Sequence, residues 1–242
     1  MKIAILGDIH ANIEALQAVV ADLDELKPDR VFCVGDIIGY GAAPRECLAL
    51  VRERGWPSVI GNWEVVLTPN DAFTPDNFNP YAKCSIYWTR GAMTAEEKEH
   101  CVALPMSIVE DGIQIAHATT GEDKTHPYLM KVEDARAAFD AAEAPVVFVG
   151  HTHVPFTFLD GDPIEYVKES EFTIPDGVKA IVNTGAVGQP RDKDPRASYV
   201  VYDTESRTVT RRRVDYDVEA AVKRIVDGGV PPILGERLRG GN

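Results

Sequence analysis

Carboxylate, amide and imidazole side chains follow five short apolar runs in this chain, each close to the point where the run ends. The side chains are those of Asp8, His10, Asp36, Asn62, His117, His151 and His153. The runs that precede them, residues 3–6, 31–34, 58–60, 113–116 and 146–149, are typical of buried strands. Because ligand sites in an open α/β sheet form outside the carboxyl ends of the strands, we expect these side chains to converge at one edge of one sheet.

These seven side chains favour a divalent-metal centre. Taken alone, each motif has a structural explanation, since an aspartate can cap a helix, an asparagine can hold a turn and a core histidine can be satisfied by hydrogen bonds. Five strand ends that all carry such a group are improbable by chance. Imidazole with carboxylate suits Mn, Fe, Zn, Co or Ni, and the lack of thiolates disfavours a structural zinc site. We therefore expect divalent ions at this edge.

A pair of such ions would support phosphoester hydrolysis. Two metals about 3.5–4 Å apart can hold the attacking and leaving oxygens of an in-line displacement, and a central aspartate with two oxygens is the natural bridge between them. A bound metal can lower the pKa of water from 15.7 to about 7, which yields a hydroxide nucleophile. The sequence has neither a G-x-S-x-G nucleophile elbow nor a P-loop, so the metal-activated hydroxide is the predicted nucleophile.

The composition is that of an ordinary globular protein. The chain has 242 residues, 45% of them hydrophobic and 26% charged, which suits one α/β domain over residues 1–242. The net charge of −13 argues against general nucleic-acid binding, because such binding relies on Lys and Arg to neutralise phosphates. No apolar stretch approaches the roughly 18–20 residues that span a bilayer, so no membrane partner is expected.

The cysteines and the amino terminus favour a cytoplasmic protein. The four cysteines form no C-x-x-C pair, and Cys33 and Cys47 fall on apolar faces, which favours buried free thiols over disulfides or thiolate metal sites. Residues 2–6 already belong to a predicted strand, without the h-region of a secretory signal. Homo-oligomerisation is left open.

The first half of the chain alternates predicted strands and helices. Apolar residues at helical spacing predict a helix over residues 13–26 that ends at Lys27-Pro28, and another over 44–54. This β-α-β-α-β order implies parallel pairing with right-handed crossovers. A helical segment at about 65–105 interrupts it, with a capping box at 94–97, and either walls the site or only packs beside it.

Strands predominate after residue 106. Asp111-Gly112 predicts the turn of a hairpin, and a helix is expected over 132–142. Short strands near residues 156, 164, 180, 198 and 208 suggest a second, mostly antiparallel sheet. A helix over 217–227 follows, and the tail from Pro231-Pro232 is expected to be partly mobile.

Together these motifs resemble the calcineurin-like metallophosphoesterase superfamily. The family pattern of D-x-H, G-D-x-x, G-N-H-D/E, a lone His and G-H-x-H is matched by residues 8–10, 35–38, 61–64, His117 and 150–153. The segments 8–12, 35–41 and 183–191 look most like a small bacterial and archaeal phosphodiesterase-like branch. The resemblance covers residues 1 to about 203.

The resemblance implies a fold and a set of roles. The fold would be an α/β sandwich of two mixed sheets packed face to face with helices outside. Asp8, His10 and His153 would hold one of two divalent ions, and Asn62, His117 and His151 the other, with Asp36 as the bridge. Asp36, Asn62 and His151 are the residues expected to bear most directly on catalysis.

One position departs from the family pattern. Trp63 stands where the family has the histidine of G-N-H-D/E, which is assigned to contacting the phosphate and helping the leaving group depart. Indole cannot donate an acidic proton, and general acid help is typically worth 10²–10⁴-fold. Because the metal ligands are intact, we expect Trp63 to affect which substrates are hydrolysed more than whether hydrolysis occurs.

Other residues are weaker candidates for substrate contacts. Asn12 could reach a phosphate oxygen, although a helix N-cap role is favoured. Arg191 and Arg196 could clamp phosphate or lie on a solvated loop. Trp63 and Tyr40 could stack on a base or aryl group or only pack, and Glu64 is expected to support the site rather than to bind metal.

The sequence thus predicts a dinuclear-metal phosphoesterase that acts on small phosphoesters, with phosphodiesters favoured. One alternative is a phosphomonoesterase for nucleotides or phosphoproteins. The other is a catalytically silent relative that serves as an interaction scaffold, against which the intact ligand set argues.

Overall fold

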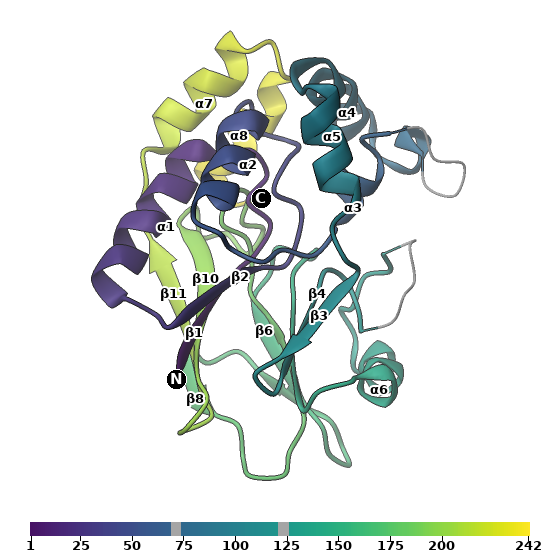
Figure 1. Cartoon of the computed structure of the whole chain (residues 1–242), viewed down its shortest axis with the longest axis vertical. Helices are drawn as coiled ribbons and strands as arrows, with labels where there is room; N and C mark the ends of the chain where they lie inside the picture. The colour runs from purple at the N-terminus through teal and green to yellow at the C-terminus, as the bar shows by residue number, and fades with distance from the viewer. Residues whose placement is uncertain (69–73, 121–125) are drawn as a thin grey trace.

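Two mixed β-sheets pack face to face, and helices cover the outer side of each (Figure 1). The computed structural model describes residues 1–68, 74–120 and 126–242. The first sheet has the order β2 (Arg30–Cys33), β1 (Lys2–Leu6), β10 (Ala197–Asp203), β11 (Thr208–Val214), β8 (Glu171–Thr173). The second has the order β3 (Ser107–Glu110), β4 (Ile113–Ala116), β5 (Val146–Val149), β9 (Ala180–Asn183), β6 (Phe156–Leu159), β7 (Glu165–Val167).

The alternation of side chains along β1 shows how the layers form. Successive side chains of a strand point to opposite faces of its sheet. Ile3 and Ile5 therefore belong to the core between the sheets, where Phe148 of β5 also lies. Ala4 and Leu6 belong to the core between the first sheet and its helices. Since both faces of β1 are buried, its apolar run is continuous.

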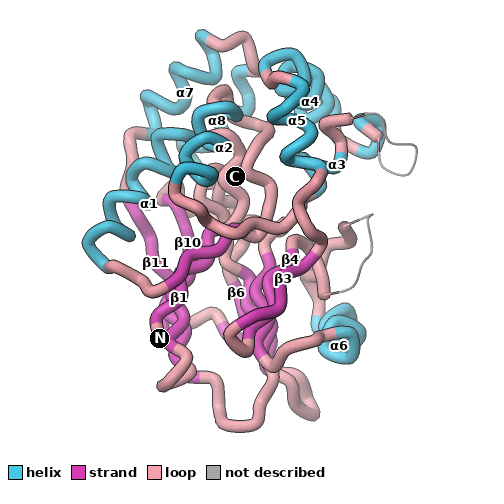
Figure 2. The backbone as a smooth tube through the Cα atoms, viewed as in Figure 1, coloured by secondary structure: helices cyan, strands magenta, loops and turns pink. Residues whose placement is uncertain are grey.

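Helices cover the outer faces of the sheets (Figure 2). They are α1 (Ile13–Leu26), α2 (Pro44–Glu53), α3 (Asn62–Val65), α4 (Pro80–Ala92), α5 (Ala95–Val102), α6 (Val132–Ala141), α7 (Val218–Asp227) and α8 (Pro232–Gly240), with a short 3-10 turn, η1 (Pro75–Asn77). Helices α1, α2, α7 and α8 contribute to the core on the first sheet, and α6 packs on the second. No helix in the described ranges is long and apolar enough to cross a membrane.

Most predicted helices are confirmed within a residue or two. Helix α1 ends at Leu26, where Lys27 adopts a left-handed conformation before Pro28. The capping box predicted at 94–97 begins α5, with Thr94 and Glu97 each accepting the backbone N–H of the other. The hairpin joins β3 and β4. Part of the predicted helical segment, residues 69–73, lies outside the described residues.

Three predictions about the fold were wrong. Residues 58–60 form only one bridge to β2, between Ser58 and Cys33, because Ile60 turns away and donates its N–H to the carbonyl of Pro105. The late strands do not make a sheet of their own: β10 and β11 join β1, whereas β6, β7 and β9 join β5. The tail forms helix α8, whose Leu234 and Leu238 are buried.

Candidate metal centre

The predicted ligands lie at the carboxyl ends of strands from both sheets. Asp8 follows β1 and Asp36 follows β2 in the first sheet, while His117 follows β4 and His151 follows β5 in the second. The expectation of one edge of one sheet was therefore wrong in one respect. Because the sheets pack face to face, the ends of β1, β2, β4 and β5 meet, and the site spans both layers.

The loops that carry the ligands have unusual backbone conformations. Asp8, His10, Asp36, His151 and His153 all have positive φ angles, between 34° and 66°. Non-glycine residues rarely adopt this region, and such residues cluster at functional sites because the surrounding structure must hold them there.

Two glycines permit close approach of the aspartates. A Cβ atom on Gly61 would lie 2.1 Å from Oδ1 of Asp36, and one on Gly150 would lie 2.2 Å from Oδ2 of Asp8. Any larger residue would displace a carboxylate. The glycine that precedes the asparagine or the histidine in these motifs therefore has a steric function.

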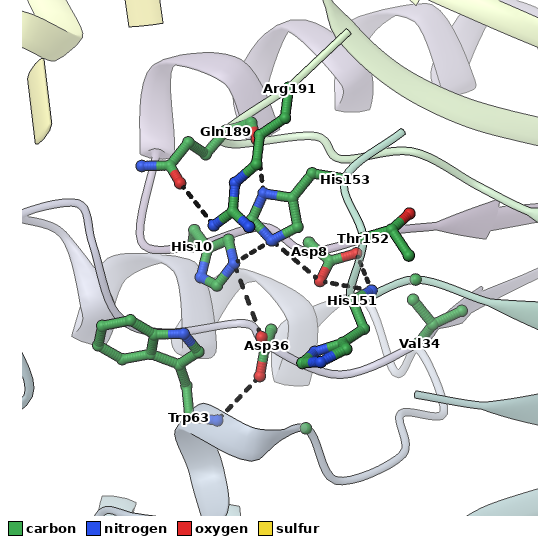
Figure 3. Close-up of polar contacts among 12 residues, drawn as sticks. Asp8, His10, Val34, Asp36, Trp63, His151, Thr152, His153, Gln189 and Arg191 are labelled. Carbon is green, nitrogen blue, oxygen red and sulfur yellow. Dashed lines mark hydrogen bonds and ion pairs between the residues drawn. The ribbon is translucent and has the colours of Figure 1, made fainter. Parts of the chain in front are cut away.

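The first group of potential ligands comprises Asp8, His10, Asp36 and His153 (Figure 3). The Nε2 atoms of His10 and His153 are 2.9 Å apart. Nε2 of His153 is 3.5 Å from Oδ1 of Asp8, and Nε2 of His10 is 3.6 Å from Oδ2 of Asp36. All four side chains are buried.

The second group shares Asp36 with the first and adds His117 and His151. Nε2 of His117 is 3.4 Å from Oδ2 of Asp36 and 3.2 Å from Nδ1 of His151. Oδ1 of Asn62 lies 3.0 Å from Nε2 of His117, so the amide oxygen joins this group. The structure thus brings all seven predicted ligands together.

Backbone carbonyls fix which nitrogen of each imidazole faces the cluster. Nδ1 of His10, His117 and His153 lies 3.1, 2.7 and 2.6 Å from the carbonyl oxygens of residues 38, 34 and 189. A carbonyl only accepts, so each Nδ1 carries hydrogen, and a neutral ring directs its Nε2 lone pair at the cluster. Two such lone pairs face each other between His10 and His153. A cation satisfies both, and the donor set therefore fits a divalent metal.

The electrostatics of the cluster agree with this fit. Burial lowers the pKa of His10 to about 4 and holds the pKa of His151 and of His153 well below the usual range. These rings are neutral at pH 7, as metal ligands must be. Burial opposes the charged form of His117 as well, but the adjacent Asp36 carboxylate raises the pKa of His117 to about 9. The buried Asp36 carboxylate therefore stabilises a positive charge beside it, which a bound divalent ion would supply.

The orientation of Asp36 differs from the expected bridge in one detail. Only Oδ2 faces both groups of ligands, because Oδ1 accepts the backbone N–H of Trp63 at 2.9 Å. One oxygen, not two, is directed at both groups. The hydrogen bond from residue 63 fixes this orientation.

Glu64 supports the loop that carries Asp36. Its buried carboxylate accepts the backbone N–H groups of Asp36, Ile37 and Gly61, each at 2.9 Å. Burial and the charge of Asp36 raise the pKa of Glu64 to about 7. Glu64 is not part of either group of ligands, and it holds the Asp36 loop against the start of α3.

We predict that Glu64→Gln weakens metal binding about 10- to 100-fold, the usual effect of losing a group that orients a ligand. A neutral amide accepts from fewer N–H groups and turns a donor toward the others. Metal titration of chelator-treated protein measures the effect. Glu97→Gln, which alters a similar cap on α5, serves as the control. Equal metal affinity in Glu64→Gln and wild type would contradict this role.

Two of the weaker candidates have other partners. The Oδ1 atom of Asn12 accepts the N–H of Ala15 as the N-cap of α1, and its Nδ2 donates to the carbonyl of Gly188. Both polar atoms are engaged within the fold, which agrees with the N-cap role that the sequence favours for Asn12 over a substrate contact. Arg196 pairs with Asp194 on the surface.

A cavity of about 120 Å³ opens over the ligands. Arg191 and Trp63 both line it. Nη2 of Arg191 donates to the hydroxyl of Tyr40 and to Oε1 of Gln189, which holds the guanidinium beside His10 and His153 (Figure 3). Trp63 is only 2% exposed and packs against Tyr40 and Phe78, with ring centroids 4.4 and 5.4 Å away. Trp63 is therefore mainly a wall of this cavity.

Sequence reasoning missed two aromatic residues at the site. Tyr128 stacks on His151 with ring centroids 4.2 Å apart, and it lines the cavity. His126 is buried, with its ring 5.4 Å from that of His117. Neither residue directly follows a strand. The only local feature of the sequence that could have pointed to them is the spacing of the histidine two residues before the tyrosine.

Comparisons with known proteins agree with this arrangement. The model of the calcineurin-like phosphoesterase superfamily domain matches residues 1–207. The uncharacterized protein MJ0912 of Methanocaldococcus jannaschii is 35% identical over 243 residues, which cover 98% of this chain and 96% of that protein.

Solved structures show the same fold. A metallophosphoesterase from Sphaerobacter thermophilus matches with a TM-score of 0.86 and 33% identity, over 100% of both chains. The hypothetical protein PH1004 from Pyrococcus horikoshii OT3 shares the fold, with a TM-score of 0.80 and 18% identity over 100% of this chain and 98% of that one. The chain belongs to the calcineurin-like phosphoesterase superfamily, whose members are metal-dependent phosphoester hydrolases in general.

Proposed function

We propose that this protein is a dinuclear-metal phosphodiesterase. The observation that carries the proposal is the pair of ligand groups that share Asp36. Asp8, His10 and His153 would hold one ion, and Asn62, His117 and His151 would hold the other. When bound, two such ions supply an activated water and hold the phosphate oxygens.

The residues of the chain then bind and orient the substrate. Arg191, held by Tyr40 and Gln189, donates to a phosphate oxygen. The attacking water gives up a proton to solvent and its oxygen forms a bond to phosphorus. The bond to the opposite ester oxygen breaks, and that oxygen takes up a proton from solvent and leaves as an alcohol. A phosphodiester thus yields a phosphomonoester and an alcohol.

The lining of the cavity favours a diester over a monoester. Among the described residues that line it, Arg191 is the single fixed cation, and the walls above the ligands are aromatic rings and amides. A diester carries one negative charge and two organic groups, whereas a monoester near neutral pH approaches two charges. One guanidinium, with aromatic rings that can contact a second organic group, suits the diester.

Chelation and metal readdition test the proposal. We expect chelator-treated protein to be inactive and to bind two Mn²⁺ per chain, with activity returning in proportion to bound metal. The reloaded protein should hydrolyse bis(p-nitrophenyl) phosphate with a higher kcat/KM than p-nitrophenyl phosphate. Faster hydrolysis of the monoester would indicate a phosphomonoesterase. Two bound ions without turnover of either substrate would indicate a scaffold.

A further inference from the structure

Two segments distant in sequence flank the cavity over the metal ligands. Asn77, Phe78 and Asn79 come from η1 and the start of α4, and Tyr128 precedes α6. Phe78 packs on Trp63, and Tyr128 stacks on His151. Trp63 and His151 lie on either side of Asp36 (Figure 3), and both segments line the same cavity.

Tyr128 combines exposure with a fixed orientation. Its side chain is 54% exposed, although its ring stacks on the buried imidazole of His151 at 4.2 Å and 30°. One face of the phenol ring is thereby supported, and the rest of the ring remains accessible at the cavity. An aromatic ring held in this way can stack on a planar group with little loss of side-chain freedom.

The two asparagines present hydrogen-bond donors at the same cavity. Oδ1 of Asn77 accepts the N–H of Thr74 at 2.7 Å. Oδ1 of Asn79 accepts the N–H groups of Tyr81 and Ala82, both at 3.1 Å, as the N-cap of α4. Since each amide oxygen is committed to the backbone, each side chain offers its Nδ2 hydrogens. Such donors suit ring nitrogens and carbonyl oxygens.

We propose that Tyr128, Asn77 and Asn79 form a subsite for a nucleobase attached to the substrate phosphate. The base stacks on Tyr128, its acceptor atoms receive hydrogen bonds from the two amides, and its phosphate lies over the ligands beside Arg191. The enzyme then selects nucleotide phosphodiesters. This subsite rests on the proposed function, because the phosphate is placed by the metal ligands.

Binding of phosphonates tests the subsite independently of turnover, because their P–C bonds are not hydrolysed. The probes are methylphosphonate, phenylphosphonate and thymidine 5′-methylenephosphonate, titrated calorimetrically into Mn²⁺-loaded protein. From the usual strength of base–aromatic stacking, we expect the phenyl ring to lower Kd roughly 5- to 150-fold relative to methyl. Hydrogen bonds from the amides should lower the Kd of the thymidine compound about 2- to 12-fold further.

Variants separate the two contributions. Tyr128→Ala should abolish the preference for phenyl over methyl, and Tyr128→Phe should retain it. Asn77→Asp and Asn79→Asp keep the Oδ1 acceptor and remove the donor, so the ratio of thymidine to phenyl affinity should fall. Tyr87→Ala removes another tyrosine that is 54% exposed, on α4 and outside the lining of the cavity, and should leave both ratios unchanged.

The outcomes distinguish the subsite from the proposed function. Equal Kd values for the three phosphonates in wild type, or equal weakening of all three in Tyr128→Ala, would overturn the subsite even if phosphodiesters are hydrolysed. A preference for the thymidine compound that depends on Tyr128 would support the subsite even if no diester were turned over, and would then point to nucleotide binding without catalysis. Circular dichroism of each variant verifies that it is folded.

Discussion

Replacing Asp36 by asparagine is expected to remove metal and activity together. Oδ2 of Asp36 faces His10 and His117, 3.6 and 3.4 Å from their Nε2 atoms, and it belongs to both groups of ligands. The backbone N–H of Trp63 needs an acceptor, so the amide oxygen of the variant should take the place of Oδ1. The amide NH₂ would then point at the metal positions, where a donor cannot act as a ligand.

We expect kcat/KM for bis(p-nitrophenyl) phosphate to fall at least about a thousandfold in Asp36→Asn. The metals contribute several kcal/mol of transition-state charge stabilisation, and each 1.4 kcal/mol lost lowers the rate about tenfold. Metal analysis should find far fewer than two ions per chain, and circular dichroism should show an intact fold because the side chains have the same shape. Asp22→Asn, at a partly buried ion pair with Arg212 and away from the ligand groups, is the matched control. Wild-type metal content in Asp36→Asn would show that Asp36 does not bridge.

Replacing Trp63 by histidine is expected to accelerate hydrolysis of esters with poor leaving groups. The wild-type indole offers no acidic proton, so esters of p-nitrophenol should be hydrolysed much faster than alkyl esters. An imidazole at this position could protonate the departing oxygen, as the family resemblance implies. General acid help is worth 10²–10⁴-fold, and the gain should be largest for alkoxide leaving groups.

Comparison of leaving groups is the measurement that decides the role of Trp63. Rates for methyl p-nitrophenyl phosphate and dimethyl phosphate in Trp63→His and wild type give the change for a good and a poor leaving group. Trp63→Phe keeps an aromatic wall without a proton donor, so the difference in rate between the two esters should stay as in wild type. The buried indole packs against Gly39, Tyr40 and Phe78, so the histidine variant will lose stability, by less than the roughly 3–5 kcal/mol of a truncation to alanine. Equal rate changes for both esters would leave Trp63 a purely packing role.

The ligand types and their places after strands were readable from the sequence because both have local causes. A buried strand requires a short apolar run, and a metal ligand at its end requires a carboxylate or imidazole on a tight loop. Helix α1 is similar, since its apolar spacing, the cap at Asn12 and Pro28 beyond its end are all local. The family motifs sharpened this reading and placed Asp36 at the centre, where both ligand groups meet.

Tertiary structure decided which strands pair and which atoms face the site. The apolar runs of β10 and β9 are alike in character, yet one joins β1 and the other β5, because pairing depends on long-range register and on the faces that each strand must bury. The same holds for Tyr128, which reaches His151 only through the packing of its segment on the second sheet. Local pattern determined the chemistry that the chain could carry, whereas contacts between distant residues oriented Asp36, engaged Nδ2 of Asn12 at the carbonyl of Gly188 and gave the cavity its aromatic walls.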